Sequence, residues 1–252
     1  MYDFQKADMW KRISAWLFDM IITVIVIVGA ALLLSAVLNY DAYSTDLQAI
    51  ESQYEQKHNL SFDISSDEYD AMNEEEQKRF DDAYASFAHD KEAVRLYGLL
   101  LNLTLIIVTF SVLLGYLLLE FLVPLLLGNG QTLGKKIFGI GVMREDGVKL
   151  SPLLLFVRTV LGKYTVETMI PVMIAIMFVF GTMGTVGLIV LIGLLGVQVM
   201  LVCATRARTP IHDKLAHTVT VDMASQRIFE SPEELLAYKQ KLHAEAVQSA
   251  DY

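Results

Sequence analysis

Residues 11–38 read KRISAWLFDMIITVIVIVGAALLLSAVL and predict the first membrane-spanning helix of the chain. From Ile13 to Leu38 the only charged side chain is that of Asp19. A helix of this length rises about 39 Å, which exceeds the roughly 30 Å thickness of the hydrocarbon core of a bilayer. A carboxylate costs about 2.5–3.5 kcal/mol near the bilayer centre and less near its edge. Asp19 is therefore expected to be paired or neutralised.

The composition places the chain among multi-pass membrane proteins. It has 252 residues, of which 54% are hydrophobic, and it contains several apolar runs near or above the spanning length. The net charge of −9 comes from one segment, since residues 41–95 hold 15 acidic and 5 basic residues, a net of −10. This acidity argues against nucleic acid or anionic lipid as a partner of that segment. Cys203 is the only cysteine, which excludes an intramolecular disulfide.

The expected fold class is an all-α polytopic membrane protein with four transmembrane helices. Two further features are expected, an extracytoplasmic α-helical insertion and a short cytoplasmic β-hairpin followed by an amphipathic interfacial helix. The first apolar run is too long for a signal peptide and is expected to remain as a signal anchor. The predicted segments are 1–38 (N-terminal segment and first helix), 39–95 (acidic lobe), 96–127 (second helix), 128–165 (hairpin and interfacial helix), 166–204 (third and fourth helices) and 205–252 (tail with a C-terminal helix).

The acidic lobe, residues 39–95, has a helical pattern. Asn73 followed by three glutamates predicts a helix N-terminus, and the apolar stripe after it predicts a helix that continues unbroken into the second span. With about 55 residues, the lobe is too small to bury much core alone. Two roles remain open, a structural or partner-docking lobe and a ligand-binding one.

The segments between and after the spans carry turn signals. Asp146-Gly147 predicts the turn of a hairpin, and Ser151-Pro152 predicts the start of a helix lying in the membrane interface. Gly181 to Gly184 predicts the turn between the third and fourth spans, although one bent helix with a re-entrant piece is an alternative for 166–204. Ser231-Pro232 predicts the start of an amphipathic C-terminal helix.

Four spans place both termini and the 128–165 segment on the same side of the membrane. That side carries most of the lysines and arginines outside the lobe, whereas the opposite side carries the acidic lobe and a short turn. The positive-inside rule therefore predicts cytoplasmic termini and an external lobe.

Several segments of the chain resemble the RDD family of bacterial membrane proteins, named for an arginine and two aspartates. Arg12 and Asp19 match the arginine and the aspartate of its first helix, and Asp213 in HDKLAHT, residues 212–218, matches the second aspartate. The stretch QTLGKK, residues 131–136, followed by GVMREDG is also similar to the family pattern. The acidic lobe departs from the family's usual brief connection, and His217 stands where the family often has glycine. The resemblance implies a bacterial inner-membrane location and suggests transport of ions or small molecules.

Charged residues of the spans are expected to gather in one leaflet. Counting along the helices from cytoplasmic termini places six of them in the cytoplasmic leaflet and its interface. These candidate site residues, a transport or ion-pair network, are Arg12, Asp19, Glu120, Arg158, Glu167 and Asp213.

Two interpretations compete for this set. In one, the residues are structural ion pairs that fix a single helix arrangement. In the other, Asp19 and Glu120 have too few close cations, so that one of them binds a proton or a cation in a cavity. His212 is suited to a pH-dependent switch, although a solvated or capping role is the alternative.

Two functions from different classes follow. The first is a small transporter or ion-coupled carrier working as a homo-oligomer, with Asp19 as the coupling site, Glu120 lining the path, and Arg12 and Asp213 as gate or lock. The second is a non-transporting scaffold or regulatory subunit whose lobe docks a protein partner. The sequence shows no catalytic triad or zinc-ligand spacing, so neither enzymatic activity nor a cofactor or metal is expected. The lipid bilayer is the partner that both functions require.

Overall fold

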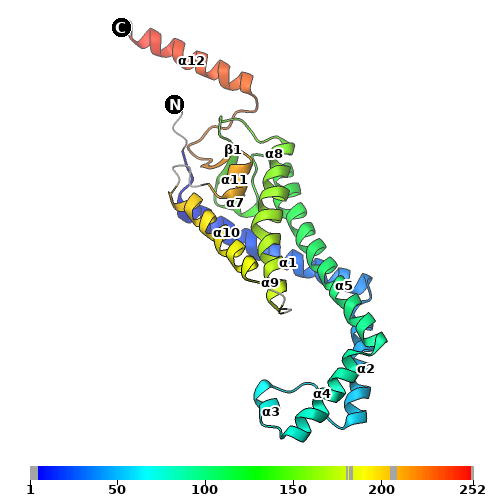
Figure 1. Ribbon diagram of the computed structural model, residues 1–252. Coiled ribbons are helices and arrows are strands. Elements are labelled where there is room, and N and C mark those ends of the chain that lie inside the picture. Colours follow the sequence, from blue (N-terminus) through cyan, green and yellow to red (C-terminus); the bar gives the residue numbers. More distant parts are fainter. Residues whose placement is uncertain (1–4, 180, 182–183, 205–208, 251–252) are drawn as a thin grey trace. The chain divides into compact units, whose positions relative to one another are not determined.

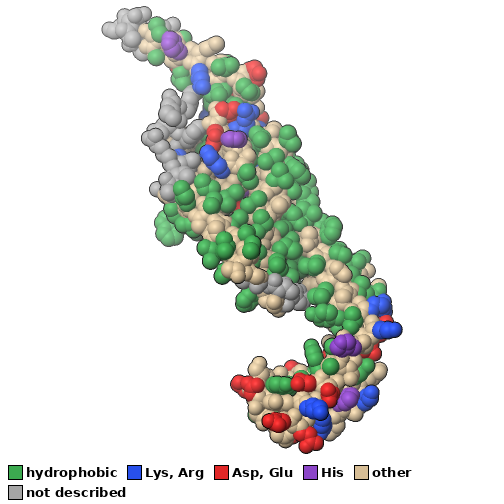
Figure 2. All heavy atoms as spheres, in the orientation of Figure 1, with side chains coloured by type: hydrophobic (Ala, Val, Ile, Leu, Met, Phe, Trp, Pro, Cys, Tyr) green, Lys and Arg blue, Asp and Glu red, His purple; other side chains and the backbone are tan. Residues whose placement is uncertain are grey.

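The computed structural model describes residues 5–179, 181, 184–204 and 209–250 (Figure 1). In these residues, four helices are long and apolar enough to cross a membrane: Met9–Val37, Lys91–Leu127, Pro152–Val179 and Thr185–Cys203. Their outward faces are apolar, and Figure 2 shows hydrophobic side chains along α9 and α10. The predicted class, a mostly helical protein with four spans, is confirmed.

The four spans comprise several helical elements. The first is α1 (Met9–Val37). The second comprises α5 (Lys91–Tyr116), the π-helix η1 (Leu117–Leu122) and α6 (Val123–Leu127). The third comprises α8 (Pro152–Phe156), the long π-helix η2 (Val157–Met169) and α9 (Ile170–Val179), and the fourth is α10 (Thr185–Ala204). The predicted turn at Gly181 to Gly184 lies largely outside the described residues.

The chain divides into two compact units, Val28–Ser111 and the remainder. The smaller unit contains the acidic lobe, with α2 (Tyr40–His58), α3 (Ser66–Asp70) and α4 (Glu74–Ala88). Asn73 caps α4 through a reciprocal capping box with Glu76, as the sequence predicted. The helix does not continue unbroken, because α4 ends at Ala88 and Asp90 accepts hydrogen bonds from the first amides of α5. Aromatic rings form the centre of the lobe: Tyr54, Phe62, Tyr69, Phe80, Tyr84 and Phe87.

The larger unit contains a two-stranded antiparallel sheet. Strand β1 (Ile140–Arg144) pairs with β2 (Thr218–Asp222) of the tail, with Val142 opposite Thr220. The predicted pairing of this strand within a hairpin is therefore wrong, because its main partner is β2 of the tail. The turn of the hairpin does form, because Gly147 adopts φ 93° and its amide donates to the Arg144 carbonyl, but only one bridge, Met143 to Lys149, follows it.

The expected interfacial helix is also different in the structure. Ser151 caps the helix at Leu154, as predicted, but the helix then runs without a break from Pro152 to Val179. Residues 151–165 are thus the beginning of the third apolar helix rather than a separate one. The apolar run 166–179 alone is short for a span, and the added residues supply the missing length.

Three short or peripheral helices complete the larger unit. They are α7 (Leu133–Ile137), α11 (Ile211–Leu215) and α12 (Pro232–Ala250). Leu235 of α12 packs with Val148 and Phe229 in a small apolar cluster. Helix α11 precedes β2, so the sheet fixes its position next to the helices that carry the charged residues.

Candidate functional site

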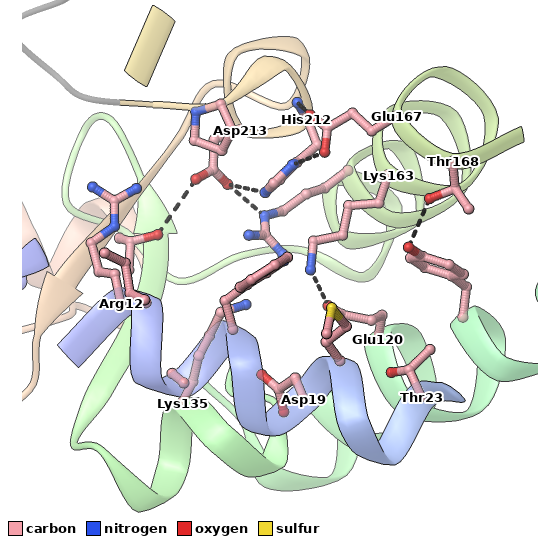
Figure 3. Close-up of a pocket in the computed structure, with 18 of the residues that line it drawn as sticks. Arg12, Asp19, Thr23, Glu120, Lys135, Lys163, Glu167, Thr168, His212 and Asp213 are labelled. Carbon is pink, nitrogen blue, oxygen red and sulfur yellow. Dashed lines mark hydrogen bonds and ion pairs between the residues drawn. The ribbon is translucent and has the colours of Figure 1, made fainter. Parts of the chain in front are cut away.

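A cavity of about 490 Å³ lies within the larger unit, between α1, η1, α7, η2, α10 and α11 (Figure 3). The six residues predicted from the sequence all line it: Arg12, Asp19, Glu120, Arg158, Glu167 and Asp213. Three further ionisable residues line it as well, Lys135, Lys163 and His212. The structure therefore brings together residues from five separate stretches of the chain.

A proline follows each of the two π-helices that carry much of this set. In an α-helix the carbonyl of Glu120 would accept from residue 124, but Pro124 has no N–H and its ring crowds that carbonyl. The helix widens, and the amide of Val123 bonds to Leu118, five residues back. The hydroxyl of Thr159 donates to the Glu120 carbonyl at 2.9 Å. The third helix repeats this pattern, because η2 ends two residues before Pro171.

The π-helical geometry decides which side chains of the third helix face the cavity. Arg158 and Glu167 are nine residues apart, which in an α-helix is two and a half turns and would place them on opposite faces. In a π-helix a turn takes about four and a half residues, so nine residues make about two turns. Arg158, Lys163 and Glu167 consequently share one face.

Arg158 and Asp213 form the most buried ion pair of the site. The Arg158 Nε donates to Asp213 Oδ1 at 2.6 Å, and both side chains are at most 2% exposed. The hydroxyl groups of Thr218 and Thr220 also donate to the Asp213 carboxylate, at 2.9 and 3.4 Å. Strand β2 thus supplies hydrogen bonds to a carboxylate that would be costly to bury with the arginine alone.

Helix α11 is fastened to the third helix at His212. Glu167 accepts from the His212 amide at 2.9 Å and contacts its Nδ1 at 2.8 Å. The two backbones approach closely at Gly162, where an added Cβ would lie 2.6 Å from the His212 Cβ and 2.7 Å from its Cα. Any larger residue at position 162 would separate these two elements.

Asp19 is held by neutral donors. Its carboxylate accepts hydrogen bonds from the Thr132 hydroxyl and from the Gly134 amide, the latter at 2.7 Å. These donors belong to the first turn of α7, whose N-cap is Thr132. A Cβ on Gly134 would overlap the carbonyl oxygen of Ala15, so α7 lies directly against α1. In the described residues no ion pair joins Asp19 to Arg12, although both belong to the network predicted from the sequence.

Two lysines that the sequence analysis did not select complete the site. Lys163 contacts Glu120 Oε2 at 2.6 Å and links the second long helix to the third (Figure 3). Lys135 follows the Gly134 contact on α7 and is 8% exposed. Burial lowers the pKa of Lys135 to about 7, and the charges of Arg158 and Lys163 act in the same direction. Two kinds of sequence signal lie near these lysines: the prolines of the second and third helices, and Thr132 as the N-cap of α7.

The electrostatics of α11 follow from its partners. Burial lowers the pKa of the His212 imidazole, although Asp213 and Glu167 oppose this effect. The pKa of Asp213 is lowered well below its usual range, because the attraction of Arg158 and His212 outweighs the desolvation that would raise it. Among the described residues, no group of three or more His, Cys, Asp or Glu side chains is placed to hold a metal ion.

Four apolar helices around a cavity lined with ionisable groups define a multi-pass membrane protein whose helices contact the lipid bilayer. The chain belongs to the RDD family, whose profile matches residues 6–217. No curated protein and no solved structure matches the chain significantly. His217, which replaces a frequent glycine of the family, adopts φ 50°, a conformation that glycine enters most easily.

Proposed function

We propose that this protein is a carrier for a small ion or solute and that the cavity of the larger unit is its substrate site. The proposal rests on one observation, that a cavity of about 490 Å³ between apolar helices is lined by nine acidic, basic and histidine residues. Ionisable groups at membrane depth are costly and commonly mark ion or substrate pathways. A volume of this size also lies within the range of small-molecule sites.

We assign different roles to the two ion pairs of the third helix: one is a fixed connection and the other is a gate that the substrate opens. Arg158 and Asp213 are fully buried and supported by two threonines, which suits a fixed connection. Lys163 and Glu120 join two long helices through one contact and are 13% and 8% exposed. We assign the gate to Lys163 and Glu120, because an incoming charge could compete with a single contact more easily than with the buried cluster.

Asp19 takes a different role in this proposal from the coupling role expected from the sequence. Its two hydrogen bonds hold the first turn of α7 against α1 and so position Lys135. We place the termini on the cytoplasmic side of a bacterial inner membrane, which the distribution of lysine and arginine supports. We also propose a homo-oligomer, because four helices enclose little space for a pathway.

The test is flux into proteoliposomes that contain the purified protein. Glu120→Gln should reduce flux of the substrate strongly, since the variant keeps the shape of the side chain but loses the ion pair with Lys163. Glu145→Gln is the matched control, because the Glu145 side chain lies on the surface and forms long ion pairs with Lys214 at 3.9 Å and His217 at 3.6 Å. Unchanged flux in a folded Glu120→Gln variant would contradict the assignment of the gate.

A second candidate function is a scaffold that binds a protein partner through the lobe. A groove of about 330 Å³ lies on the lobe beside Phe62, Tyr69 and Phe80, and acidic side chains surround this region (Figure 2). Replacement of residues 41–90 by a short flexible linker separates the two candidates. If the shortened variant no longer co-purifies with a protein partner but its flux is unchanged, docking is favoured. If the flux is lost, the lobe is assigned to transport.

A further inference from the structure

The nitrogens of two buried cations in the cavity have no hydrogen-bond acceptor within the described part of the chain. They are Nζ of Lys135 and Nη1 of Arg158. Lys135 is 8% exposed and Arg158 is 1% exposed. A charged donor that is buried without an acceptor is strongly unfavourable. Both residues line the same cavity, and the charge of Arg158 acts on the Lys135 ammonium.

The acidic residues around the cavity are already engaged. Asp213 accepts from Arg158 Nε, Glu120 pairs with Lys163, Glu167 contacts His212, and Asp19 accepts from the first turn of α7. Glu120 Oε2 makes no directed hydrogen bond but lies 2.6 Å from the Lys163 ammonium, so each acidic residue has a partner. Lys135 Nζ and Arg158 Nη1 have no acceptor in the described part of the chain. A cation entering this space would have to displace an existing pair, whereas an anion would find two donors.

We propose that Lys135 and Arg158 form the binding site for the oxyanion group, carboxylate or phosphate, of the carried solute. This inference deepens the proposed function by naming the chemistry of its substrate. The guanidinium group suits oxyanions because its N–H donors form a planar fork that matches carboxylate and phosphate oxygens. With Nε on Asp213, the Nη1 edge of Arg158 supplies one arm, and the ammonium group of Lys135 supplies a second donor.

Protonation of Lys135 couples to this binding. The charged groups that act on its ammonium are Arg158 and Lys163, which disfavour the proton, and Glu120 and Asp213, which favour it. Burial is the largest influence and lowers the pKa of Lys135 to about 7. A bound oxyanion adds negative charge nearby and raises this pKa, so binding above neutral pH takes up a proton. The carried anion would consequently cross with a proton.

The experiment is titration calorimetry of the purified protein in nanodiscs of zwitterionic lipid, with inorganic phosphate and acetate as separate probes. We expect saturable binding of at least one probe, weakened roughly ten-fold or more in Lys135→Met. Lys136→Met is the matched control, because Lys136 is the exposed neighbour on α7, and its binding should be unchanged. Lys135→Arg should recover part of the affinity, since it restores a cationic donor. Thermal unfolding of each variant excludes a loss of fold as the cause.

Three outcomes decide the matter. Equal binding in Lys135→Met and in the natural protein, or no binding of phosphate, acetate or added phosphatidic acid, overturns the inference. If the protein binds phosphatidic acid in the discs but neither phosphate nor acetate, and this binding depends on Lys135, the oxyanion site is supported but is assigned to a lipid headgroup. In buffers of different ionisation enthalpy at about pH 8.5, proton uptake should accompany binding and disappear in Lys135→Met.

The same variants separate this inference from the proposed function. Binding that depends on Lys135 in a protein without flux would keep the oxyanion site and overturn transport. Flux that is unaffected by Lys135→Met would keep transport and overturn the site.

Discussion

The hydroxyl of Thr159 donates a hydrogen bond of 2.9 Å to the main-chain carbonyl of Glu120. In an α-helix this carbonyl would accept from residue 124, which is a proline without an N–H, and a side chain of the third helix supplies a donor to it. Thr159 is fully buried, and water cannot replace its hydroxyl easily. The bond therefore fixes the two π-helices beside each other at the depth of the cavity.

Thr159→Val should destabilise the protein by about 1–3 kcal/mol, because it keeps the volume of the side chain and removes a buried donor from the Glu120 carbonyl. Thermal unfolding in detergent measures the effect. Thr165→Val is the control, since the exposed Thr165 hydroxyl bonds only to Val160 of its own helix. Equal stability of the two variants would show that the interhelical bond contributes nothing.

Arg158→Met should cost about 3–5 kcal/mol, because it leaves the Asp213 carboxylate buried without its main charge partner. Combining it with Asp213→Asn should cost less than the sum of the two single changes, as expected for a direct pair. Chemical unfolding of all three variants gives the coupling. The exposed pair Lys149 and Glu230 provides the contrast, and Glu230→Gln should cost under about 1 kcal/mol. If the two single changes add up to the change of the double variant in the free energy of unfolding, a direct interaction between Arg158 and Asp213 is contradicted.

Gly134→Ala should prevent α7 from contacting α1, because the added methyl group would overlap the Ala15 carbonyl and crowd the Asp19 carboxylate. We expect reduced thermal stability and loss of anion binding, since Lys135 would move away from the cavity. Gly29→Ala is the control, because nothing lies within 4 Å of a Cβ at that position. Alanine favours a helix more than glycine, so this control should be neutral or slightly more stable.

The stability of the protein relative to Lys135→Met should depend on pH. The folded pKa of Lys135 lies near 7, below the ordinary value of 10.5, so the unfolded chain binds more protons between these two values. The free energy of unfolding of the natural protein should therefore rise relative to the variant as the pH increases from about 7 to about 10. Unfolding of both proteins in anion-poor buffer measures the difference. A constant difference across this range would place the lysine in a solvated position.

Cysteine labelling tests the orientation of the chain. With Cys203→Ser as background, Ser61→Cys introduces a thiol in the lobe and Ser225→Cys introduces one between β2 and α12, both at exposed positions. A membrane-impermeant maleimide should label the lobe position in intact cells and the Ser225 position only after permeabilisation. The opposite pattern would reverse the predicted orientation.

The sequence predicted the local features of the fold well. The first apolar helix, expected over residues 11–38, spans Met9–Val37, because the length of an apolar run needs no distant partner. The partner of β1 could not be predicted in this way, since β2 lies 74 residues after β1. Local turn chemistry pointed to a hairpin instead.

Six residues that line the cavity were selected from the sequence, but Lys135, Lys163 and the contacts of the site were not. Depth along each helix was enough to gather Arg158, Glu167 and Asp213. An α-helical period could not predict that Arg158 and Glu167 lie on one face of the third helix, because η2 is a π-helix. Asp19 was expected to be paired or neutralised, and its partners are a hydroxyl and an amide of α7, which sequence spacing does not reveal.

The position of β2 between two earlier segments has a consequence for synthesis at the ribosome. Strand β2 pairs with β1 on one edge, and on its other edge Val221 forms a bridge with Lys6. Both partners are translated before β2, and at 5–20 residues per second Arg144 waits roughly 4–15 s for Thr218. The Asp213 carboxylate is translated 55 residues after Arg158. The nascent chain therefore holds Arg158 without this counterion over that interval, and the cavity can take its final form only after α11 and β2 have been synthesised.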